Sequence, residues 1–268
     1  MHPTLFEIGD HAVATYGFMG AMAWLVALIA GFVIGPRRGE DPWFILEIMI
    51  TLIVAGIVGG RVMFVLQHSE EFSGQWIQVF NLRTGGLVYL GGVLTSAAAI
   101  AFHARATKRN PLEILDLLTP LLGLAIFIAR WGCFGAGCCY GREAPHLPWA
   151  VVFSDPQSLA PLGVPVHPTQ IYLSLVNLTL FFATLWFLFR KHRHGQVFLI
   201  YLIGYSALRF FVEFFRGDPA REYYIEIELW GNDIPEMLST SQGLSLVLFA
   251  IGVFLWPRVG REKAERVR

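Results

Sequence analysis

Charge is scarce in this sequence of 268 residues. Only 15% of the residues are charged, whereas 55% are hydrophobic, and the formal net charge is zero. Soluble domains usually carry about 25% charged residues. The shortage therefore indicates that lipid surrounds most of the chain. The neutral balance also argues against a nucleic-acid-binding protein, which would present a basic face.

Lys and Arg are missing from the first twelve positions. A cleaved secretory signal peptide would have a positively charged start, a short apolar region and a cleavage site with small residues. The chain begins differently, and its first long apolar run starts at residue 13. We therefore expect this run to remain in the protein as its first membrane helix.

Long apolar runs recur along the chain. A helix needs about 20 apolar residues to cross the hydrocarbon core. The sequence predicts about seven transmembrane helices, over residues 13–34, 43–66, 86–104, 111–129, 169–189, 196–215 and 240–257. The third run is rich in glycine and could be partly re-entrant, and the fourth is the weakest because Glu113 and Asp116 lie in its first turns. The predicted fold class is all-α, a polytopic membrane protein with one membrane domain over residues 1–268.

Lys and Arg are distributed unevenly between the predicted loops. Thirteen of the 20 basic residues lie in three short loops and the C-terminal tail, at residues 35–42, 105–110, 190–195 and 258–268. Because basic loops usually stay in the cytoplasm, the sequence predicts an outside N-terminus and a cytoplasmic C-terminus. The longer loops with few charges then face outward, at residues 67–85, 130–168 and 216–239. We expect any chemistry on this outer side.

Polar side chains recur at helical spacing along the sixth apolar run. They are Tyr205, Arg209, Glu213 and Arg216. Spacings of four, four and three residues place them on one face of a helix. An Arg at mid-bilayer costs about 2.5–3.5 kcal/mol on insertion scales, so such residues usually pair or line a wet site. The stripe is interpreted as the lining for an anionic headgroup, and an Arg–Glu pair with snorkelling side chains is the alternative.

A glycine-rich segment follows the fourth run. Arg130 and Arg142 bracket it, and four of the residues between them are glycine. Glycine lets a ligand approach the backbone closely, and Arg offers planar, multi-donor contacts to phosphate. The segment predicts a phosphate site that includes Gly132, Gly137 and Gly141. A tight turn between helices, with the arginines at the membrane surface, is the alternative.

Further candidate binding residues are scattered over the rest of the chain. Arg61 follows a pair of glycines, and Tyr89 and Leu90 precede another pair. Paired glycines in apolar helices are as often close-packing sites. His167 and Gln170 flank Pro168 at the start of the fifth run, where they could face an outer cavity or cap the helix.

All three cysteines fall within seven residues, at Cys133, Cys138 and Cys139. A disulfide from Cys133 to either of the others, with one free thiol, would fit an oxidising outer compartment. A metal site would need a fourth ligand, such as His146 or His167. A redox-active or acyl-carrying thiol is the third alternative.

In this order, the segments together resemble the prolipoprotein diacylglyceryl transferases. The resemblance covers roughly residues 13–255. The arginine loop and the arginine helix carry most of it, whereas the paired glycines are less specific. The segments that match family segments are Tyr16–Gly17, Gly59–Arg61, Ala129–Arg142, His167–Tyr172 and Tyr205–Arg216.

The resemblance implies a reaction and its site residues. Members of the family move the diacylglyceryl group of phosphatidylglycerol onto the lipobox cysteine thiol of a prolipoprotein signal peptide, in the bacterial cytoplasmic (inner) membrane, without a cofactor or a metal. The catalytic residues implied here are Arg130, Arg209, Tyr205 and Glu213. The implied substrate-binding residues are Tyr16, Arg61, Tyr89, Gly132, Gly137, Gly141, Arg142, His167, Gln170 and Arg216.

The sequence departs from the family pattern at several polar positions. The family has a His before Gly-Gly in the third run, discussed as the base that takes the thiol proton, and Leu90 corresponds to it. The Asn and Glu of the family loop correspond to Cys133 and Cys138. Leu173 stands where a Glu follows the family's His-Pro segment. The arginine framework is therefore kept while several of its polar partners are not.

These departures leave more than one function open. An active transferase would take its base from Tyr89, His167 or Glu213. A paralogue would use another acceptor, or bind phospholipid without turnover. A membrane thiol oxidoreductase rests on the cysteines alone, which lack a Cys-x-x-Cys spacing. A retinal protein is excluded because residues 240–257 contain no Lys.

Overall fold

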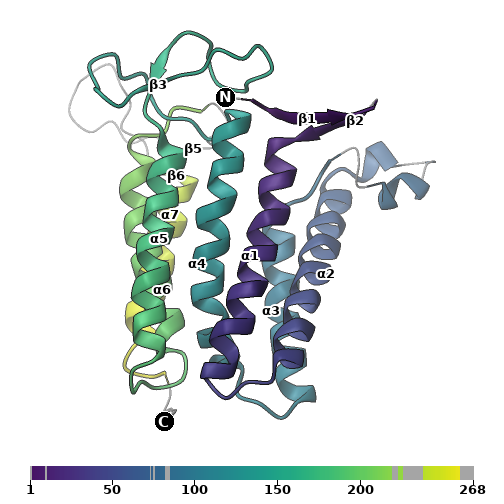
Figure 1. Ribbon diagram of the computed structural model, residues 1–268, viewed down its shortest axis with the longest axis vertical. Coiled ribbons are helices and arrows are strands. Elements are labelled where there is room, and N and C mark those ends of the chain that lie inside the picture. Colours follow the sequence, from purple (N-terminus) through teal and green to yellow (C-terminus); the bar gives the residue numbers. More distant parts are fainter. Residues whose placement is uncertain are drawn as a thin grey trace. The chain divides into compact units, whose positions relative to one another are not determined.

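The computed structural model describes residues 2–9, 11–72, 74, 76–81, 85–218, 223–225 and 238–259. Within them the chain forms seven α-helices (Figure 1). They are α1 (Thr15–Arg37), α2 (Pro42–Gln67), α3 (Tyr89–Ala106), α4 (Pro111–Ala136), α5 (Thr169–Leu188), α6 (Gln196–Glu213) and α7 (Thr240–Leu255). Each coincides with one predicted apolar run, so the all-α prediction is confirmed.

Five of these helices, α1, α2, α4, α5 and α6, are long and apolar enough to cross a membrane. α7 is a shorter apolar helix. The glycine-rich third run, considered partly re-entrant, forms the continuous helix α3. The protein is therefore a polytopic all-α membrane protein. The side of the membrane on which each terminus lies stays a prediction.

Short strand pairs and 3-10 helices complete the described chain, and none of them was predicted. Each pair is antiparallel. The strands are β1 (Thr4–Ile8) with β2 (His11–Ala14), β3 (Val151–Val152) with β4 (Pro165–Val166), and β5 (Tyr223–Ile225) with β6 (Leu238–Ser239). The 3-10 helices are η1 (Ser69–Phe72) and η2 (Trp76–Phe80). Residues 82–84, 219–222, 226–237 and 260–268, which include parts of the predicted loops and tail, lie outside the described residues.

Residue contacts divide the chain into two compact units. Unit 1 holds residues 1–30 and the described chain from residue 116 onward, and unit 2 holds residues 31–115. Each unit is described by itself below, and the single membrane domain expected from the sequence stays a prediction.

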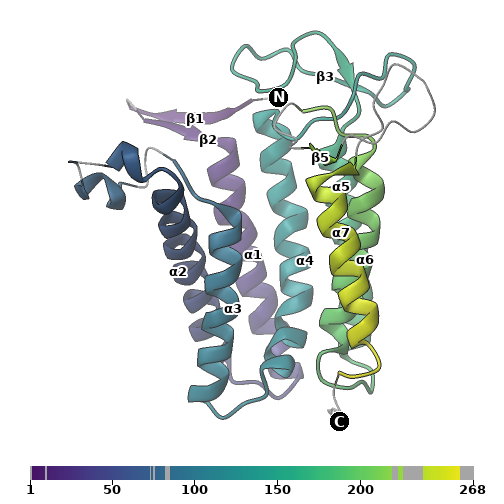
Figure 2. The same cartoon turned by 180° about the vertical axis from the view of Figure 1, so that it is seen from behind.

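Unit 2 is built on the close packing of α2 against α3, which lie side by side in opposite views (Figures 1 and 2). A Cβ added to Gly59 would lie 2.0 Å from Thr95 Oγ1, and one added to Gly91 would lie 2.2 Å from the carbonyl oxygen of Gly59. The hydroxyl of Thr95 donates to the carbonyl of Ala55 on α2, at 2.7 Å. The paired glycines therefore serve close helix packing, the alternative considered for them.

In unit 1, α4 is longer than predicted and continues through a glycine-rich stretch to Ala136. A Cβ added to Gly132 would lie 3.2 Å from the Cα of Tyr16, and one added to Gly135 would lie 2.5 Å from Thr15 Cγ2. The small residues thus let the start of α1 pack against the end of α4. The loop predicted at 130–168 consequently begins only after residue 136.

The fourth run was expected to be the weakest span, yet α4 is one of the five apolar candidates. Its buried Asp116 explains the difference. The two carboxylate oxygens accept the N–H groups of Gly195 and Phe198, at 2.6 and 2.9 Å. These groups belong to the first turn of α6, whose donors have no partner within the helix. Asp116 therefore caps α6 from a neighbouring helix.

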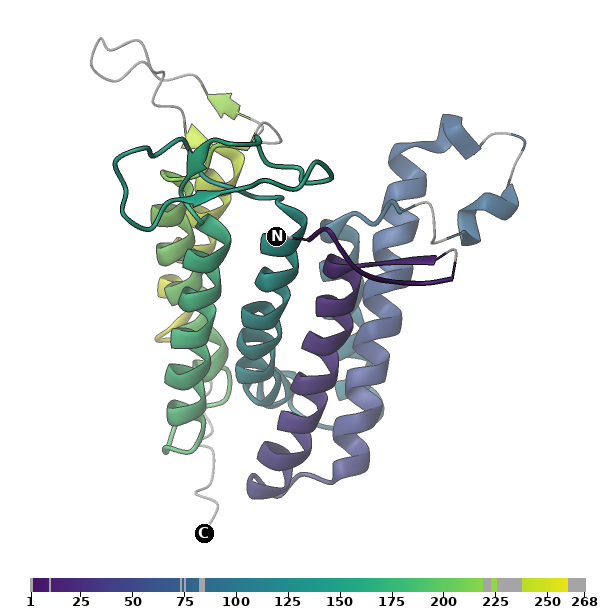
Figure 3. The same ribbon diagram turned by 45° about the horizontal axis from the view of Figure 1, so that its top comes forward.

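One end of unit 1 brings several elements together. The end of α4, the start of α5, the end of α6 and the start of α7 lie there, below the segment that carries β3 and β4 (Figure 3). That segment has a small apolar core of Phe153, Ala160 and Val166. We call this region the loop end of unit 1.

Candidate functional site

The polar stripe of α6 ends in a buried ion-pair network. Arg209 and Glu213 are only 9% and 1% exposed, and they pair through Nη1 and Oε2. The hydroxyl of Ser239 donates to Glu213 Oε1 at 3.0 Å. Nη1 of Arg216 lies 3.8 Å from Glu213 Oε2. Both oxygens of Glu213 are thus engaged, so this carboxylate positions two arginines.

Three residues of this network, two partners of the arginines and one of Glu213, were missed by sequence reasoning. Ser241 accepts from Arg209 Nη2 at 3.1 Å. Asp218 accepts two hydrogen bonds from Arg216, at 2.8 and 2.5 Å. Ser239 opens α7 in a capping box with Gln242. The Ser-x-x-Gln spacing before the last apolar run was a readable signal for this helix start.

Arg130 lies on the last turns of α4 and not in a loop. It is within hydrogen-bonding reach of Tyr205 on α6. The ring of Tyr205 stacks on that of Tyr201, with centroids 5.7 Å apart. Tyr201 in turn donates to Asn177 Oδ1 on α5 at 2.6 Å. Arg130 is therefore joined to the polar stripe of α6 through a tyrosine that its neighbours hold in place.

The glycines after α4 make close contacts within the protein. A Cβ on Gly141 would lie 2.4 Å from the Cβ of His167 and 2.6 Å from the carbonyl oxygen of Phe215. The N–H of Gly141 donates to the carbonyl of His167 at 2.9 Å, and that of Gly137 donates to Phe134 at 3.3 Å. The N–H groups of Gly137 and Gly141, both predicted at a phosphate site, are therefore bonded to the chain itself. The arginines are left as the cationic groups of the site.

Arg142 joins the glycine-rich segment to the end of α6. Its N–H donates to the carbonyl of Phe215 at 2.8 Å, and its carbonyl accepts from the N–H of His167 at 3.0 Å. Its Nε donates to the carbonyl of Arg216 at 3.3 Å. The side chain of Arg142 is exposed. Its positive charge therefore lies at the surface, beside the buried network.

His167 stands at the end of β4 with its ring held on two sides. Its Nδ1 lies 3.1 Å from the hydroxyl of Tyr172, which also accepts from Trp149 Nε1 at 2.8 Å. The ring of Phe215 packs against it with centroids 5.1 Å apart. Burial, and then the positive charge of Arg142, lower the pKa of His167 below its ordinary value. The imidazole is therefore neutral at neutral pH and able to accept a proton.

Gln170 is fully buried and does not face solvent. Its Nε2 donates to the carbonyl of Cys138 at 2.8 Å. The hydroxyl of the adjacent Thr169 donates to the carbonyl of Cys139 at 2.6 Å. The first turn of α5 thus fixes the backbone of the segment that carries two of the three cysteines.

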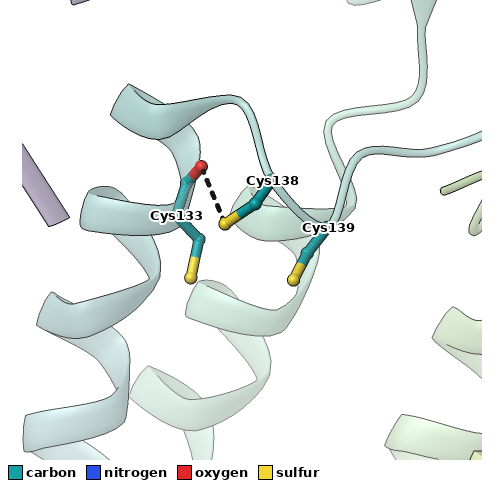
Figure 4. A group of neighbouring side chains, drawn as sticks. All are labelled: Cys133, Cys138 and Cys139. Carbon is teal, nitrogen blue, oxygen red and sulfur yellow. Dashed lines mark hydrogen bonds between the residues drawn. The ribbon is translucent and has the colours of Figure 1, made fainter. Parts of the chain in front are cut away.

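The three cysteines are free thiols whose sulfur atoms all lie within 4.8 Å of one another (Figure 4). The expected disulfide is not formed. Neither His146 nor His167 belongs to the cluster, which among the described residues consists of cysteines alone. We call Cys133, Cys138 and Cys139 the cysteine cluster.

The thiols of the cysteine cluster differ in acidity. Hydrogen bonds from the other two thiols, and then the positive charges of Arg216 and Arg130, lower the pKa of Cys139. Hydrogen bonds to its neighbours and burial raise the pKa of Cys138. A negative charge in the cluster is therefore held mainly at Cys139, next to the arginines.

Arg61, in unit 2, is buried and bonded to its own unit. Its guanidinium donates five hydrogen bonds of 2.7–3.3 Å to backbone carbonyls between residues 78 and 86. It also packs on the rings of Phe64 and Phe72. These contacts give Arg61 a structural role at the connection to α3. Tyr89 and Leu90, at the start of that helix, are 84% and 56% exposed. Tyr16, in unit 1, is 59% exposed.

The helices and the buried charges at the loop end of unit 1 define a multi-pass membrane protein with a polar centre among its spans. A family model described as prolipoprotein diacylglyceryl transferase matches residues 3–258. The chain belongs to this family of transferases, as its motifs suggested.

Curated relatives agree with the family match over nearly the whole chain. A phosphatidylglycerol–prolipoprotein diacylglyceryl transferase of Clostridium tetani is 34% identical over 256 residues, which cover 96% of this chain and 97% of that protein. A relative in Clostridium perfringens, phosphatidylglycerol–prolipoprotein diacylglyceryl transferase 2, is 32% identical over 96% of this chain and 94% of its own length. One in Verminephrobacter eiseniae is also 32% identical, over 97% of this chain and 94% of its own.

Proposed function

We propose that this protein transfers the diacylglyceryl group of phosphatidylglycerol to the lipobox cysteine thiol of a prolipoprotein, in the bacterial inner membrane. The curated relatives are named for both substrates. The observation that carries the proposal is the gathering of Arg130, Arg209 and Arg216 around Tyr205 and Glu213. Cations buried beside apolar spans suit a ligand with an anionic headgroup and apolar tails.

The arginines would hold the phosphate of the lipid. The hydrogen bonds of Arg209 to Glu213 and Ser241 use one N–H on each of two nitrogens. A guanidinium has five N–H donors, so a paired arginine keeps capacity for phosphate oxygens. Arg130 is joined to the phenol of Tyr205 and lies near Cys133 and Cys139. We therefore assign Arg130 and Arg209 to the headgroup and Tyr205 to the positioning of Arg130.

The transfer breaks one bond and forms another at the same carbon. The sulfur of the acceptor cysteine attacks the glycerol carbon that carries the phosphate. A C–S bond forms as the C–O bond breaks, and glycerol phosphate leaves with the electron pair. The leaving oxygen gains negative charge, and fixed cations at that point lower the barrier. The thiol proton must pass to a base because the thiolate is the nucleophile.

We assign the base to His167 among the three candidates. Glu213 has both carboxylate oxygens engaged by protein partners. Tyr89 carries a phenol, whose ordinary pKa of about 10 requires a further base. His167 is neutral because its pKa is lowered. With Nδ1 donating to the oxygen of Tyr172, the lone pair of Nε2 can accept the thiol proton.

The test mixes the purified protein in detergent with phosphatidylglycerol vesicles and a lipobox peptide, and weighs the peptide by mass spectrometry. A diacylglyceryl increment on the cysteine, absent from a Cys→Ser peptide, is the expected result. The relative of Clostridium tetani serves as the positive control. No increment while that control is active would overturn the proposal. Phosphatidylglycerol retained without turnover would then favour the binding-only paralogue.

A further inference from the structure

The cysteine cluster has no part in the proposed transfer, since the reacting thiol belongs to the substrate. Cys133 comes from the last turns of α4, and Cys138 and Cys139 come from the segment that follows (Figure 4). The three sulfur atoms lie close together, and Cys138 Sγ also lies 3.7 Å from the carbonyl oxygen of Cys133. Three soft donors thus converge from two parts of the backbone.

The spacing of the sulfur atoms suits one shared metal ion. Metal–thiolate bonds are about 2.3 Å long, so three sulfurs around a planar three-coordinate ion lie roughly 4 Å apart. The three Sγ atoms already lie within 4.8 Å of one another. Side-chain rotations that move each sulfur by less than about 1 Å would therefore bring the three sulfurs to the spacing of a three-coordinate metal site.

The backbone around the cysteine cluster is fixed in an uncommon conformation. Cys139 has a φ of 59°, which residues with a side chain rarely adopt. Gly137 has a φ of 75°, and a Cβ there would lie 2.1 Å from Ser158 Oγ. The carbonyls of Cys138 and Cys139 are held from α5 by Gln170 and Thr169. These constraints keep the sulfurs together without a covalent bond between them.

The surroundings favour a bound anionic complex. Three thiolates around a monovalent cation carry a net charge of two minus. The positive charges of Arg130 and Arg216 act on Cys139, although that of Arg216 is shared with Asp218. Such a complex needs compensation of this kind, because an unpaired charge in an apolar setting is costly.

We propose that Cys133, Cys138 and Cys139 bind one Cu(I) ion through their three thiolate sulfurs. Thiolates select Cu(I) and Zn(II) among the available metals. A structural Zn(II) site takes four protein ligands, whereas the cluster offers three, with no histidine or carboxylate among the described residues that belong to it. On binding, the protons that remain on the three thiols pass to solvent and no electron is transferred. The proposed metal site shares Arg130 with the proposed headgroup site, and its test reads metal binding and not lipid transfer.

The test uses the full-length protein in detergent, reduced with a phosphine and kept free of oxygen. Cu(I) is titrated against a coloured Cu(I) chelator, and X-ray absorption counts the sulfur neighbours of the metal. We expect one Cu(I) per chain, three sulfur neighbours, and an affinity that falls at least about tenfold in each of Cys133→Ser, Cys138→Ser and Cys139→Ser. His146→Ala, an exposed histidine of the same loop, is the matched control and should bind as the unchanged chain does.

A second measurement uses the unchanged chain, so that the test does not depend on the folding of the serine variants. Bound Cu(I) should protect all three cysteines from alkylation together, as read by peptide mass spectrometry. Full binding by all three serine variants, or alkylation unaffected by Cu(I), would overturn the site. A fourth nitrogen or oxygen neighbour with tighter binding of Zn(II) than of Cu(I) would overturn the assignment to copper.

Discussion

Arg209 and Glu213 form a buried ion pair one turn apart on α6, and α7 supplies a hydroxyl to each of them. Ser241 contacts the arginine and Ser239 the carboxylate. The pair is therefore held from a second helix, which keeps the guanidinium in one orientation. Because both charges lie at the end of apolar helices, each depends on the other for its stability in that place.

Replacing the carboxylate should destabilise the protein. In Glu213→Gln the buried Arg209 loses its charged partner, and breaking one side of a buried pair costs about 3–5 kcal/mol. We expect a clear fall in the thermal unfolding midpoint in detergent. Glu143→Gln, on the exposed part of the loop, is the control and should leave the midpoint unchanged. Equal midpoints for the two variants would contradict the assigned role of Glu213.

Removing either arginine assigned to the headgroup should abolish most of the transfer. Loss of one donor to a developing negative charge typically lowers kcat by about 10²–10³-fold. We expect losses of this size or larger for Arg130→Ala and Arg209→Ala, measured as peptide lipidation per unit of inserted protein. Arg190→Ala, an exposed arginine after the far end of α5, should keep its rate. Near-normal rates for both site variants would exclude the proposed binding of the lipid phosphate by Arg130 and Arg209.

The pH dependence of the transfer should follow His167. A base works in its neutral form, and burial together with Arg142 lowers the pKa of this imidazole. The rate should therefore be constant above the ordinary histidine pKa of about 6.5 and fall only at lower pH. His167→Gln should lower the rate and abolish its fall at acidic pH, whereas His146→Gln should leave both the rate and its pH dependence unchanged. A rate that still falls at acidic pH in His167→Gln would assign the base to another group.

A methyl group at Gly141 should disrupt the packing of the segment after α4 against the end of α6. The added Cβ would lie within 2.6 Å of both His167 and the carbonyl of Phe215, which are held by backbone hydrogen bonds. Overpacking of this kind costs about 1–3 kcal/mol. We expect Gly141→Ala to lower the unfolding midpoint and Gly20→Ala, in open space on α1, to leave it unchanged or raise it. A harmless Gly141→Ala would show that the loop can move away from α6.

Hydropathy was sufficient to locate all seven helices, because a run of apolar residues has few alternatives to a helix in lipid. Hydropathy predicted the ends of the helices less well. α4 passes the predicted boundary since Gly132 and Gly135 lie against α1, a contact invisible in a count of apolar residues. The weakness expected of α4 was wrong for a similar reason, as the partner that satisfies Asp116 lies about 80 positions further along the chain.

The candidate site was predicted in its charges and less well in its contacts. Helical spacing found Tyr205, Arg209 and Glu213, since three residues on one face need no tertiary information. It could not find Asp218, which contacts Arg216 after a turn, or Ser239, which contacts Glu213 from the start of a separate helix. Arg61 was predicted as a substrate ligand from a motif alone, and the carbonyls that surround it belong to η2 and the segment after it, which the sequence did not predict.

The cap that Asp116 gives to α6 also constrains how the protein is made. The ribosome releases α4 before the first turn of α6 exists, so during its insertion the carboxylate has no N–H group to accept from Gly195 and Phe198. A bare carboxylate is costly in hydrocarbon, so we expect the start of α4 to stay near water at first. We expect Asp116 to become stably buried only when α6 arrives and brings the cap. We therefore expect α4 and α6 to reach their final packing in unit 1 together, whenever α5, which lies between them in the sequence, is inserted.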